Sequence, residues 1–233
     1  MKKLAIMQPY LFPYIGYFQL INAVDKFVTY DDVAFIKQGW INRNNILVNG
    51  NPFLFTIPVK NISSYSLINE TEVSYNNDWK SKLFKTIQES YRKAPYFENI
   101  FQIIENTFTT DERYISKIAT KSILEIVKYL ELQTEFQESS TSYQNSGLRS
   151  QERVLDICKK ELANQYINPI GGKGLYSKST FKIQHIQLDF MKTHPVEYRQ
   201  LKNGFVSNLS IIDVLMFNSP VEINLMLQSY ELV

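Results

Sequence analysis

The chain has 233 residues, and its 25 lysines and arginines nearly balance its 23 aspartates and glutamates, which leaves a net charge of +2. Proteins dedicated to nucleic acids usually carry a strong basic excess, so this balance argues against nucleic acid as a partner. The single cysteine excludes an internal disulfide and a zinc site made of several thiolates, and two histidines are few for any other metal centre. We therefore predict no metal site built from cysteines or histidines.

Hydropathy gives no sign of a membrane protein. No stretch of about 18 apolar residues occurs, so the sequence predicts no membrane span. The apolar run that begins at Leu4 is interrupted by Gln8 and Pro9, which is not the pattern of a secretory signal. We expect a cytoplasmic protein.

The N-terminal part has the pattern of a strand, a loop, a helix and a second strand. Residues 4–7 form a short apolar run that stops at Gln8, as a buried strand would. Apolar residues with helical spacing follow Gly16, and residues 26–30 form a second apolar run that ends at Asp31-Asp32. This unit favours a parallel α/β core with loops at the carboxyl ends of its strands.

The rest of the chain adds a hairpin, a group of helices and a return to alternation. Asn49-Gly50-Asn51 separates two apolar runs, 40–48 and 52–58, and predicts a hairpin because both Asn and Gly tolerate positive φ. Helices are expected between residues 75 and 130, the first capped by Asp78. The last third predicts strands at 135–138, 165–168 and 186–191 and helices at 149–164, 210–217 and 221–227. We expect one α/β domain over residues 1–233, with a Rossmann-like core of the nucleotidylyltransferase type, a β-hairpin and a helical insertion at about 75–130.

The loop after the first strand carries the first candidate binding residues, Gln8, Tyr10, Tyr14, Gly16 and Tyr17. Ligands of open α/β sheets bind where such strands end. The order Tyr14-Ile15-Gly16-Tyr17 resembles the His-x-Gly-His signature of nucleotidylyltransferases, with tyrosines in place of both histidines. A phenol can donate a hydrogen bond to a phosphate but carries no positive charge. The alternative is that Gly16 allows a tight turn and that the tyrosines pack.

Asp31 and Asp32 close the second predicted strand. Two carboxylates at a strand end could bind Mg²⁺, orient a ribose, or act as acid and base. Adjacent side chains of a strand point to opposite faces, so we expect one of the two to face the site and favour Asp32. An ordinary turn is the alternative.

The stretch 37–44 is rich in recognition chemistry, because it contains Lys37, Trp40, Asn42, Arg43 and Asn44. Arginine binds phosphate or carboxylate as a fork, lysine binds as a point charge, and tryptophan offers a flat stacking surface. In a strand over 40–48, Asn42 and Asn44 would share one face and Arg43 would point to the other. The set suits a polar, anionic small molecule; the alternative is an exposed edge strand with solvated charges.

A glycine-rich loop follows the predicted strand 165–168. Gly171, Gly172 and Tyr176 are candidate binding residues there, because backbone N–H groups of such a loop can surround an anion. The loop lacks the spacing of a P-loop, and a flexible turn is the alternative.

Single residues elsewhere favour structural roles. Cys158 has helical spacing with apolar neighbours, so a buried thiol is expected rather than a nucleophile. His185 and His194 have no local partner that would mark them as acid–base groups. Asp213 lies in a very apolar helix and needs a partner, for which we predict Arg43 or Lys37.

Several of these stretches together resemble the WbqC-like family over essentially the whole chain. They are residues 7–10, 13–18, 30–32, 37–44, 93–97, 171–172 with 175–176, and 209–213. The resemblance implies a context among bacterial genes for O-antigen and other surface polysaccharides, and with it amino-sugar or sugar-nucleotide biosynthesis. It transfers no catalytic residues.

Two functional hypotheses follow. In the first, the chain is an enzyme that binds a nucleotide-linked or phosphorylated small molecule and catalyses acyl, aminoacyl or nucleotidyl transfer, with ATP or Mg²⁺ as candidate cofactors. The predicted catalytic residues are Asp32, as base or Mg²⁺ ligand, and Lys37 and Arg43, which would hold the anionic part. In the second, the chain is a non-catalytic binding or assembly protein of a polysaccharide-synthesis complex. Its partner surface would then be formed by aromatic residues of the helical insertion, namely Tyr91, Tyr96, Phe97 and Phe101.

Overall fold

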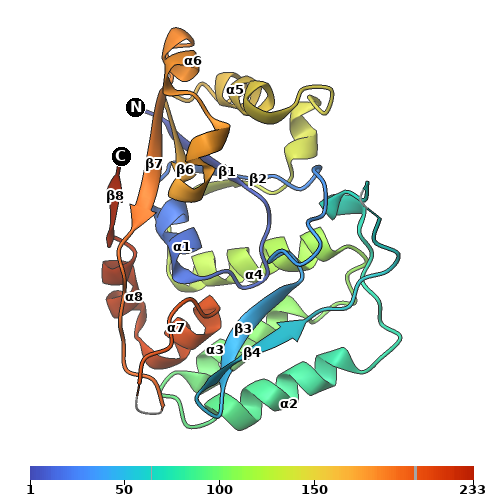
Figure 1. Cartoon of the computed structure of the whole chain (residues 1–233). Helices are drawn as coiled ribbons and strands as arrows, with labels where there is room; N and C mark the ends of the chain where they lie inside the picture. Colours follow the sequence, from blue (N-terminus) through green and yellow to red (C-terminus); the bar gives the residue numbers. More distant parts are fainter. Residues whose placement is uncertain (64, 202–203) are drawn as a thin grey trace.

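The computed structural model describes residues 1–63, 65–201 and 204–233. Its centre is a six-stranded sheet in the order β5-β2-β1-β6-β7-β8 (Figure 1). The strands are β1 (Lys3–Met7), β2 (Lys26–Thr29), β5 (Glu135–Gln137), β6 (Gln165–Pro169), β7 (Gln187–Thr193) and β8 (Tyr230–Leu232). All neighbouring pairs are parallel except β7 and β8, which are antiparallel. The expected parallel α/β core is therefore present, and β8 was not predicted.

The strand order locates the place where a ligand is expected. Numbered along the chain, the five parallel strands lie in the order 3-2-1-4-5, so the order reverses between β1 and β6. In open α/β sheets, ligands bind outside the carboxyl ends of the strands at such a reversal. The loops that follow β1 and β6 are thus the first places to search for a site.

Both faces of the sheet are covered, because successive side chains of a strand point to opposite faces. Ala5 of β1 belongs to the larger apolar core, together with residues of α1 (Ile15–Asn22). Its neighbours Leu4 and Ile6 belong to a second core that includes Cys158 of α5 (Ser150–Lys160). This alternation explains why β1 is a continuous apolar run in the sequence.

The hairpin is confirmed as a separate two-stranded sheet of β3 (Arg43–Val48) and β4 (Asn51–Thr56). Asn49 and Gly50 have φ values of 53° and 83°, the left-handed pair that the Asn-Gly dipeptide predicts. The first strand is shorter than expected, since Trp40 and Asn42 precede β3. Trp40 is instead held in the preceding loop, where its carbonyl accepts a hydrogen bond from Leu11 N at 3.0 Å.

Helices occupy the segment between the hairpin and β5, as expected. They are α2 (Trp79–Tyr91), α3 (Phe97–Thr107) and α4 (Ile115–Tyr129), and they lie around the hairpin on one side of the molecule (Figure 1). Asp78 occupies the N-cap position of α2 but makes no side-chain hydrogen bond there, so the predicted cap is wrong. The remaining helical elements are α6 (Lys178–Ile183), α7 (Ile211–Phe217), α8 (Pro220–Met226) and the 3₁₀ turns η1 (Ile68–Glu70), η2 (Ser140–Tyr143) and η3 (Ile170–Leu175).

Burial also tests the predicted partner surface. Tyr91 is 0% exposed and Phe97 is 8% exposed, and Tyr96 and Phe101 are partly buried against the larger core. Tyr91 and Phe97 are therefore too buried to form the predicted partner surface, whereas partner contacts by the partly exposed Tyr96 and Phe101 stay a prediction. In the described part of the chain, no helix is long and apolar enough to cross a membrane.

Candidate functional site

The loop between β1 and α1 is fixed in place by polar side chains from distant parts of the chain. Asn44 of β3 donates from Nδ2 to the carbonyls of Leu11 and Phe12 at 3.0 and 2.7 Å. Ser210 donates to the same Phe12 carbonyl at 2.7 Å, while Phe12 N donates to Ser122 Oγ at 3.0 Å. These bonds hold Phe12 at a φ of 41°, which few residues other than glycine adopt, so the loop is tightly constrained.

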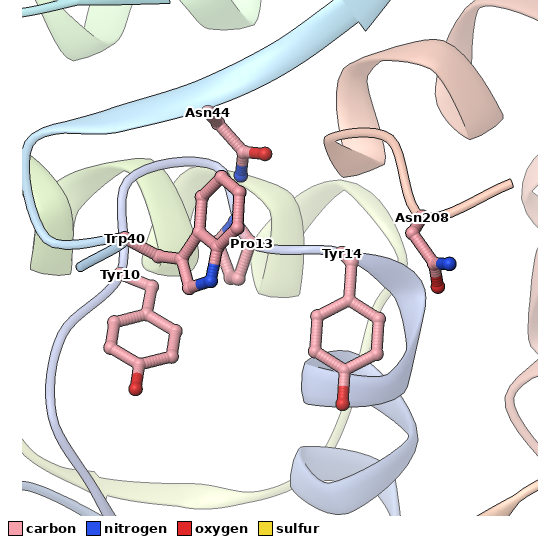
Figure 2. A pocket seen from close by; sticks show the side chains of 6 residues that line it. All are labelled: Tyr10, Pro13, Tyr14, Trp40, Asn44 and Asn208. Atoms are coloured by element: carbon pink, nitrogen blue, oxygen red, sulfur yellow. The ribbon is translucent and has the colours of Figure 1, made fainter. Parts of the chain in front are cut away.

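A cavity of about 200 Å³ opens beside this loop. It is lined by Tyr10, Pro13, Tyr14, Trp40, Asn44 and Asn208. Figure 2 shows the indole of Trp40 between the phenol rings of Tyr10 and Tyr14, whose hydroxyl groups point to the same side. Trp40 is 43% exposed and Tyr14 is 37% exposed. We call this space the aromatic cavity.

Gly16 determines the position of the Tyr14 ring. A Cβ atom at Gly16 would lie 2.3 Å from Cε2 of Tyr14, so the phenol lies directly across the first turn of α1. A glycine is therefore needed at position 16 for the Tyr14 ring to approach the backbone of α1 this closely. Tyr17 is 2% exposed and donates its hydroxyl to the carbonyl of Gln8 at 2.9 Å. Burial raises the pKa of Tyr17 well above its ordinary value. Its hydrogen bond to Gln8 helps to fix the loop that follows β1.

A second cavity, of about 410 Å³, adjoins the first through Tyr14 and Asn208, which line both. Its walls are the first turn of α1, the chain that follows β7, and the start of α7. We call it the α1–β7 cavity. Asn208 was not a candidate in the sequence; its only signal is a polar pair, Ser207-Asn208, before an apolar helix.

The basic stretch 37–44 reaches the aromatic cavity through Trp40 and Asn44 only. Arg43 donates from Nε to the carbonyl of Gly39 at 3.0 Å and from Nη2 to the carbonyl of Gln38, so it fixes its own loop. Asn42 is buried and donates to the carbonyl of Ile57 at 2.8 Å. Lys37 is exposed and lines neither cavity. Ligand contacts by these three residues stay predictions.

Asp31 and Asp32 are both engaged by protein groups. Asp31 is 3% exposed and accepts hydrogen bonds from Ser139 Oγ at 2.8 Å and Ser140 N at 3.1 Å. Burial raises the pKa of Asp31, although these bonds oppose the effect. Asp32 accepts from Ser140 Oγ on one oxygen and pairs with Arg153 through the other. Neither carboxylate lines the two cavities, so the predicted catalytic role of Asp32 and the predicted substrate contact of Asp31 stay predictions.

The diglycine segment lies at the carboxyl end of β6, in the 3₁₀ turn η3. A Cβ atom at Gly172 would lie 2.0 Å from Nδ2 of Asn168, whereas Gly171 faces open space. Tyr176 packs its ring against Tyr166, with centroids 5.7 Å apart. None of the three candidates, Gly171, Gly172 and Tyr176, lines the aromatic or the α1–β7 cavity.

Asp213 of α7 is completely buried, and its partners differ from those expected. Tyr91 donates to its Oδ2 at 2.8 Å, while Tyr198 and Gln200 donate to its Oδ1 at 2.7 and 2.8 Å. Burial raises the pKa of Asp213, and the three hydrogen bonds act in the opposite sense. The predicted lysine or arginine partner is therefore wrong, because neutral donors from other parts of the chain satisfy the carboxyl group.

Side chains suited to a metal do not gather in this region. Among the described residues, no group of three or more His, Cys, Asp or Glu side chains could hold a metal ion. Cys158 is completely buried, as predicted, and burial raises the pKa of its thiol to about 12. The two cavities therefore offer aromatic rings for stacking, polar groups for hydrogen bonding, and the side chains of His194 and Glu197, which line the α1–β7 cavity.

Comparison with known proteins gives two matches of sequence. The model of the WbqC-like protein family matches residues 8–225. The chain is 28% identical over 225 residues to the "Uncharacterized protein Rv1507c" of Mycobacterium tuberculosis (strain ATCC 25618 / H37Rv), and the match covers 95% of this chain and 96% of that protein. No solved structure matches the chain.

Proposed function

The chain belongs to the WbqC-like protein family, and we propose that it is a cytoplasmic enzyme of bacterial surface-polysaccharide (O-antigen) or amino-sugar biosynthesis. It would bind a nucleotide-linked or phosphorylated small molecule and catalyse an acyl, aminoacyl or nucleotidyl transfer. The observation that carries this proposal is the aromatic cavity beside the loop that follows β1. The strand order 3-2-1-4-5 supports a Rossmann-like core, of the nucleotidylyltransferase type, around that loop.

The aromatic cavity would bind the flat part of the ligand. Tyr10, Tyr14 and Trp40 present ring faces, and partly exposed aromatic rings gathered in one cavity are typical of a binding site. A nucleobase or the apolar face of a sugar ring would stack against Trp40. The carboxamides of Asn44 and Asn208 lie at the wall and can exchange hydrogen bonds with hydroxyl groups.

Phosphate groups of the ligand would bind to backbone N–H groups and to positively charged side chains nearby. Tyr14, at the N-cap position of α1, makes no side-chain cap hydrogen bond, so the first turn has N–H groups available for an anion. Lys37 and Arg43 flank Trp40 in sequence and would contribute positive charge. Both oxygens of Asp32 are engaged by Ser140 and Arg153, so the proposal routes no step through Mg²⁺.

Isothermal titration calorimetry with a panel of nucleotide-linked sugars and ATP tests the proposal. At least one member should bind, and Trp40→Ala should weaken that binding roughly tenfold or more, since stacking contributes about 1–3 kcal/mol. Phe53→Ala provides a matched control, because Phe53 of hairpin strand β4 is also an exposed ring (44%) but lines neither cavity. No heat with any member, or equal binding by Trp40→Ala, would contradict the proposal.

A further inference from the structure

The helix α6 and the first residues of β7 border an open groove that is separate from the two cavities described above. Its volume is about 690 Å³. The lining includes three basic side chains, Lys178, Lys182 and His185, and one carboxylate, Asp189. None of these residues lines the aromatic cavity or the α1–β7 cavity. Figure 1 shows α6 at one end of the molecule. We call this hollow the α6–β7 groove.

The groove has an excess of positive charge. Lys178 and Lys182 lie one turn apart on α6, so they share one face of the helix. The Asp189 carboxylate is 3.9 Å from Nζ of Lys178. Its Oδ2 accepts hydrogen bonds from the side chains of Gln165 and Gln187, both at 2.6 Å. Among the described residues, Lys182 has no acidic partner. The one carboxylate of the groove is therefore satisfied by protein groups, while Lys182 remains available to an anion.

Large apolar side chains project into solvent beside these charges. Ile183 of α6 is 73% exposed, and Leu175, just before α6, is 70% exposed. Leu162, in the turn before β6, is 80% exposed. A single exposed leucine is ordinary, but apolar side chains gathered on one surface are typical of an interaction site. We call these three residues, together with Lys178, Lys182 and His185, the α6 surface.

Hydrogen bonds between neighbouring strands place Leu162 beside the groove. The N–H group of Gln187, a lining residue, donates to the carbonyl of Asn164 at 2.8 Å. Asn164 is two residues after Leu162, and its own N–H group donates to the carbonyl of Lys2 at 2.9 Å. The turn that carries Leu162 therefore adjoins the start of β7, and the N-terminal end of β1 lies next to it.

The helix α6 is anchored on its inner side only. Phe181 is completely buried, and its ring stacks on Tyr166 with centroids 5.6 Å apart. Ile186 N donates to the carbonyl of Phe181 at 3.1 Å, which holds the end of the helix against β7. Two residues of a helix lie about 200° apart around its axis, so Ile183 points away from the core when Phe181 points into it. The exposed side chains of α6 therefore stand on a fixed element.

We propose that the α6 surface docks onto an anionic lipid membrane, with Lys178 and Lys182 at the lipid phosphate groups and with Ile183 and Leu162 inserted among the upper parts of the acyl chains. Lysines near such a membrane are attracted by its negative surface potential, and inserted apolar side chains add the burial of their own surface. The apolar side chains stand at turns and at the end of a helix rather than in one flat face. This arrangement suits a fluid layer better than the close packing of a protein interface.

Flotation of the full chain with phospholipid vesicles tests the proposal. The protein should float with vesicles of equal parts phosphatidylglycerol and phosphatidylcholine, and it should not float with vesicles of phosphatidylcholine alone. Added salt should release it, because salt screens the attraction between exposed charges. Lys178→Gln with Lys182→Gln should weaken the binding roughly tenfold or more, since one lysine near an anionic surface contributes about fivefold. Ile183→Ser should weaken it at least about threefold, because the inserted apolar surface is lost.

Lys82→Gln with Lys85→Gln is the matched control. These lysines are also exposed and about one turn apart, and they lie on α2, at the opposite end of the molecule from α6 (Figure 1). The control loses the same charge and should bind vesicles as the wild type does. Thermal unfolding of each variant checks that its fold is kept, which the exposure of the substituted residues leads us to expect.

Three results would overturn the proposal. The first is a wild type that does not float with the phosphatidylglycerol vesicles, which would leave an acidic protein as the occupant of the α6 surface. The second is equal flotation with phosphatidylcholine alone, and the third is an equal loss of binding in the α6 and α2 variants. Flotation is measured without any soluble substrate, so its outcome is independent of what the aromatic cavity binds and of the proposed function.

Discussion

Arg153 of α5 forms an ion pair with Asp32 at the end of β2, and the two side chains are only 4% and 9% exposed. The guanidinium also donates from Nε to Asn145 Oδ1 at 2.9 Å and lies over the ring of Tyr30, 4.9 Å from its centroid. The guanidinium of Arg153 is therefore surrounded by protein groups rather than by solvent. The pair joins the carboxyl end of the inner strand β2 to the helix that covers the second face of the sheet.

Breaking this ion pair should destabilise the protein. Arg153→Met leaves the Asp32 carboxylate buried without a cation, and the expected loss in the free energy of unfolding is about 3–5 kcal/mol. Urea denaturation measures it. The double variant Asp32→Asn with Arg153→Met should recover part of the loss, because no charge is then left buried. An Arg153→Met variant as stable as the wild type would show that the pair is not formed.

Gly16→Ala should separate stability from ligand binding. The new Cβ would displace only the outer atoms of the partly exposed Tyr14 ring, so we expect a change in stability of less than about 1 kcal/mol. The ring would nevertheless leave its place in the aromatic cavity, and ligand affinity should fall. Thermal unfolding and calorimetric titration of the same sample check both effects. Unchanged affinity would mean that the ring of Tyr14 does not contact the ligand.

Asp213 should make stability depend on pH in a predictable direction. Burial raises its pKa, so the folded state binds the proton more tightly than the unfolded state. Its contribution to stability is therefore complete below its unfolded pKa of about 4 and is lost as pH rises through the folded pKa. The free energy of unfolding of the wild type minus that of Asp213→Asn should fall over this range. A difference that is constant or that rises with pH contradicts the assignment.

The thiol of Cys158 should react only when the protein opens. It is 0% exposed, and burial raises its pKa to about 12, so little thiolate is present at neutral pH. Labelling with a disulfide reagent should be slow in the native protein and should accelerate in parallel with urea unfolding. Rapid labelling of the native protein would show that α5 does not cover the thiol as described.

The sequence was most informative about elements whose formation depends on neighbouring residues alone. The apolar runs of β1 and β2 and the Asn49-Gly50 turn were predicted because a buried parallel strand and a left-handed turn leave signatures in neighbouring residues. The strand β8 was not predicted, because it has only three residues and its pairing with β7 is set by the tertiary structure.

The site was predicted less completely, because its contacts join residues far apart in the chain. Tyr10, Tyr14 and Trp40 were candidates and do line one cavity, but Asn208 comes from the far end of the sequence. The prediction of the partners of Asp213 was wrong for the same reason, since its actual partner Tyr91 is 122 positions away in the sequence. Arg43 satisfies carbonyl groups of its own loop, a role that the residue type alone does not reveal.

The fluorescence of Trp40 tests the central claim, that the aromatic cavity binds the ligand, most directly. The chain has two tryptophans, and Trp40 is 43% exposed whereas Trp79 is 8% exposed. Titration with UDP-N-acetylglucosamine, related nucleotide-linked sugars and ATP should give a saturable change in emission for at least one of them. That change should persist in Trp79→Phe and disappear in Trp40→Phe. No change with any of these ligands, or the same change in Trp40→Phe, would contradict the account.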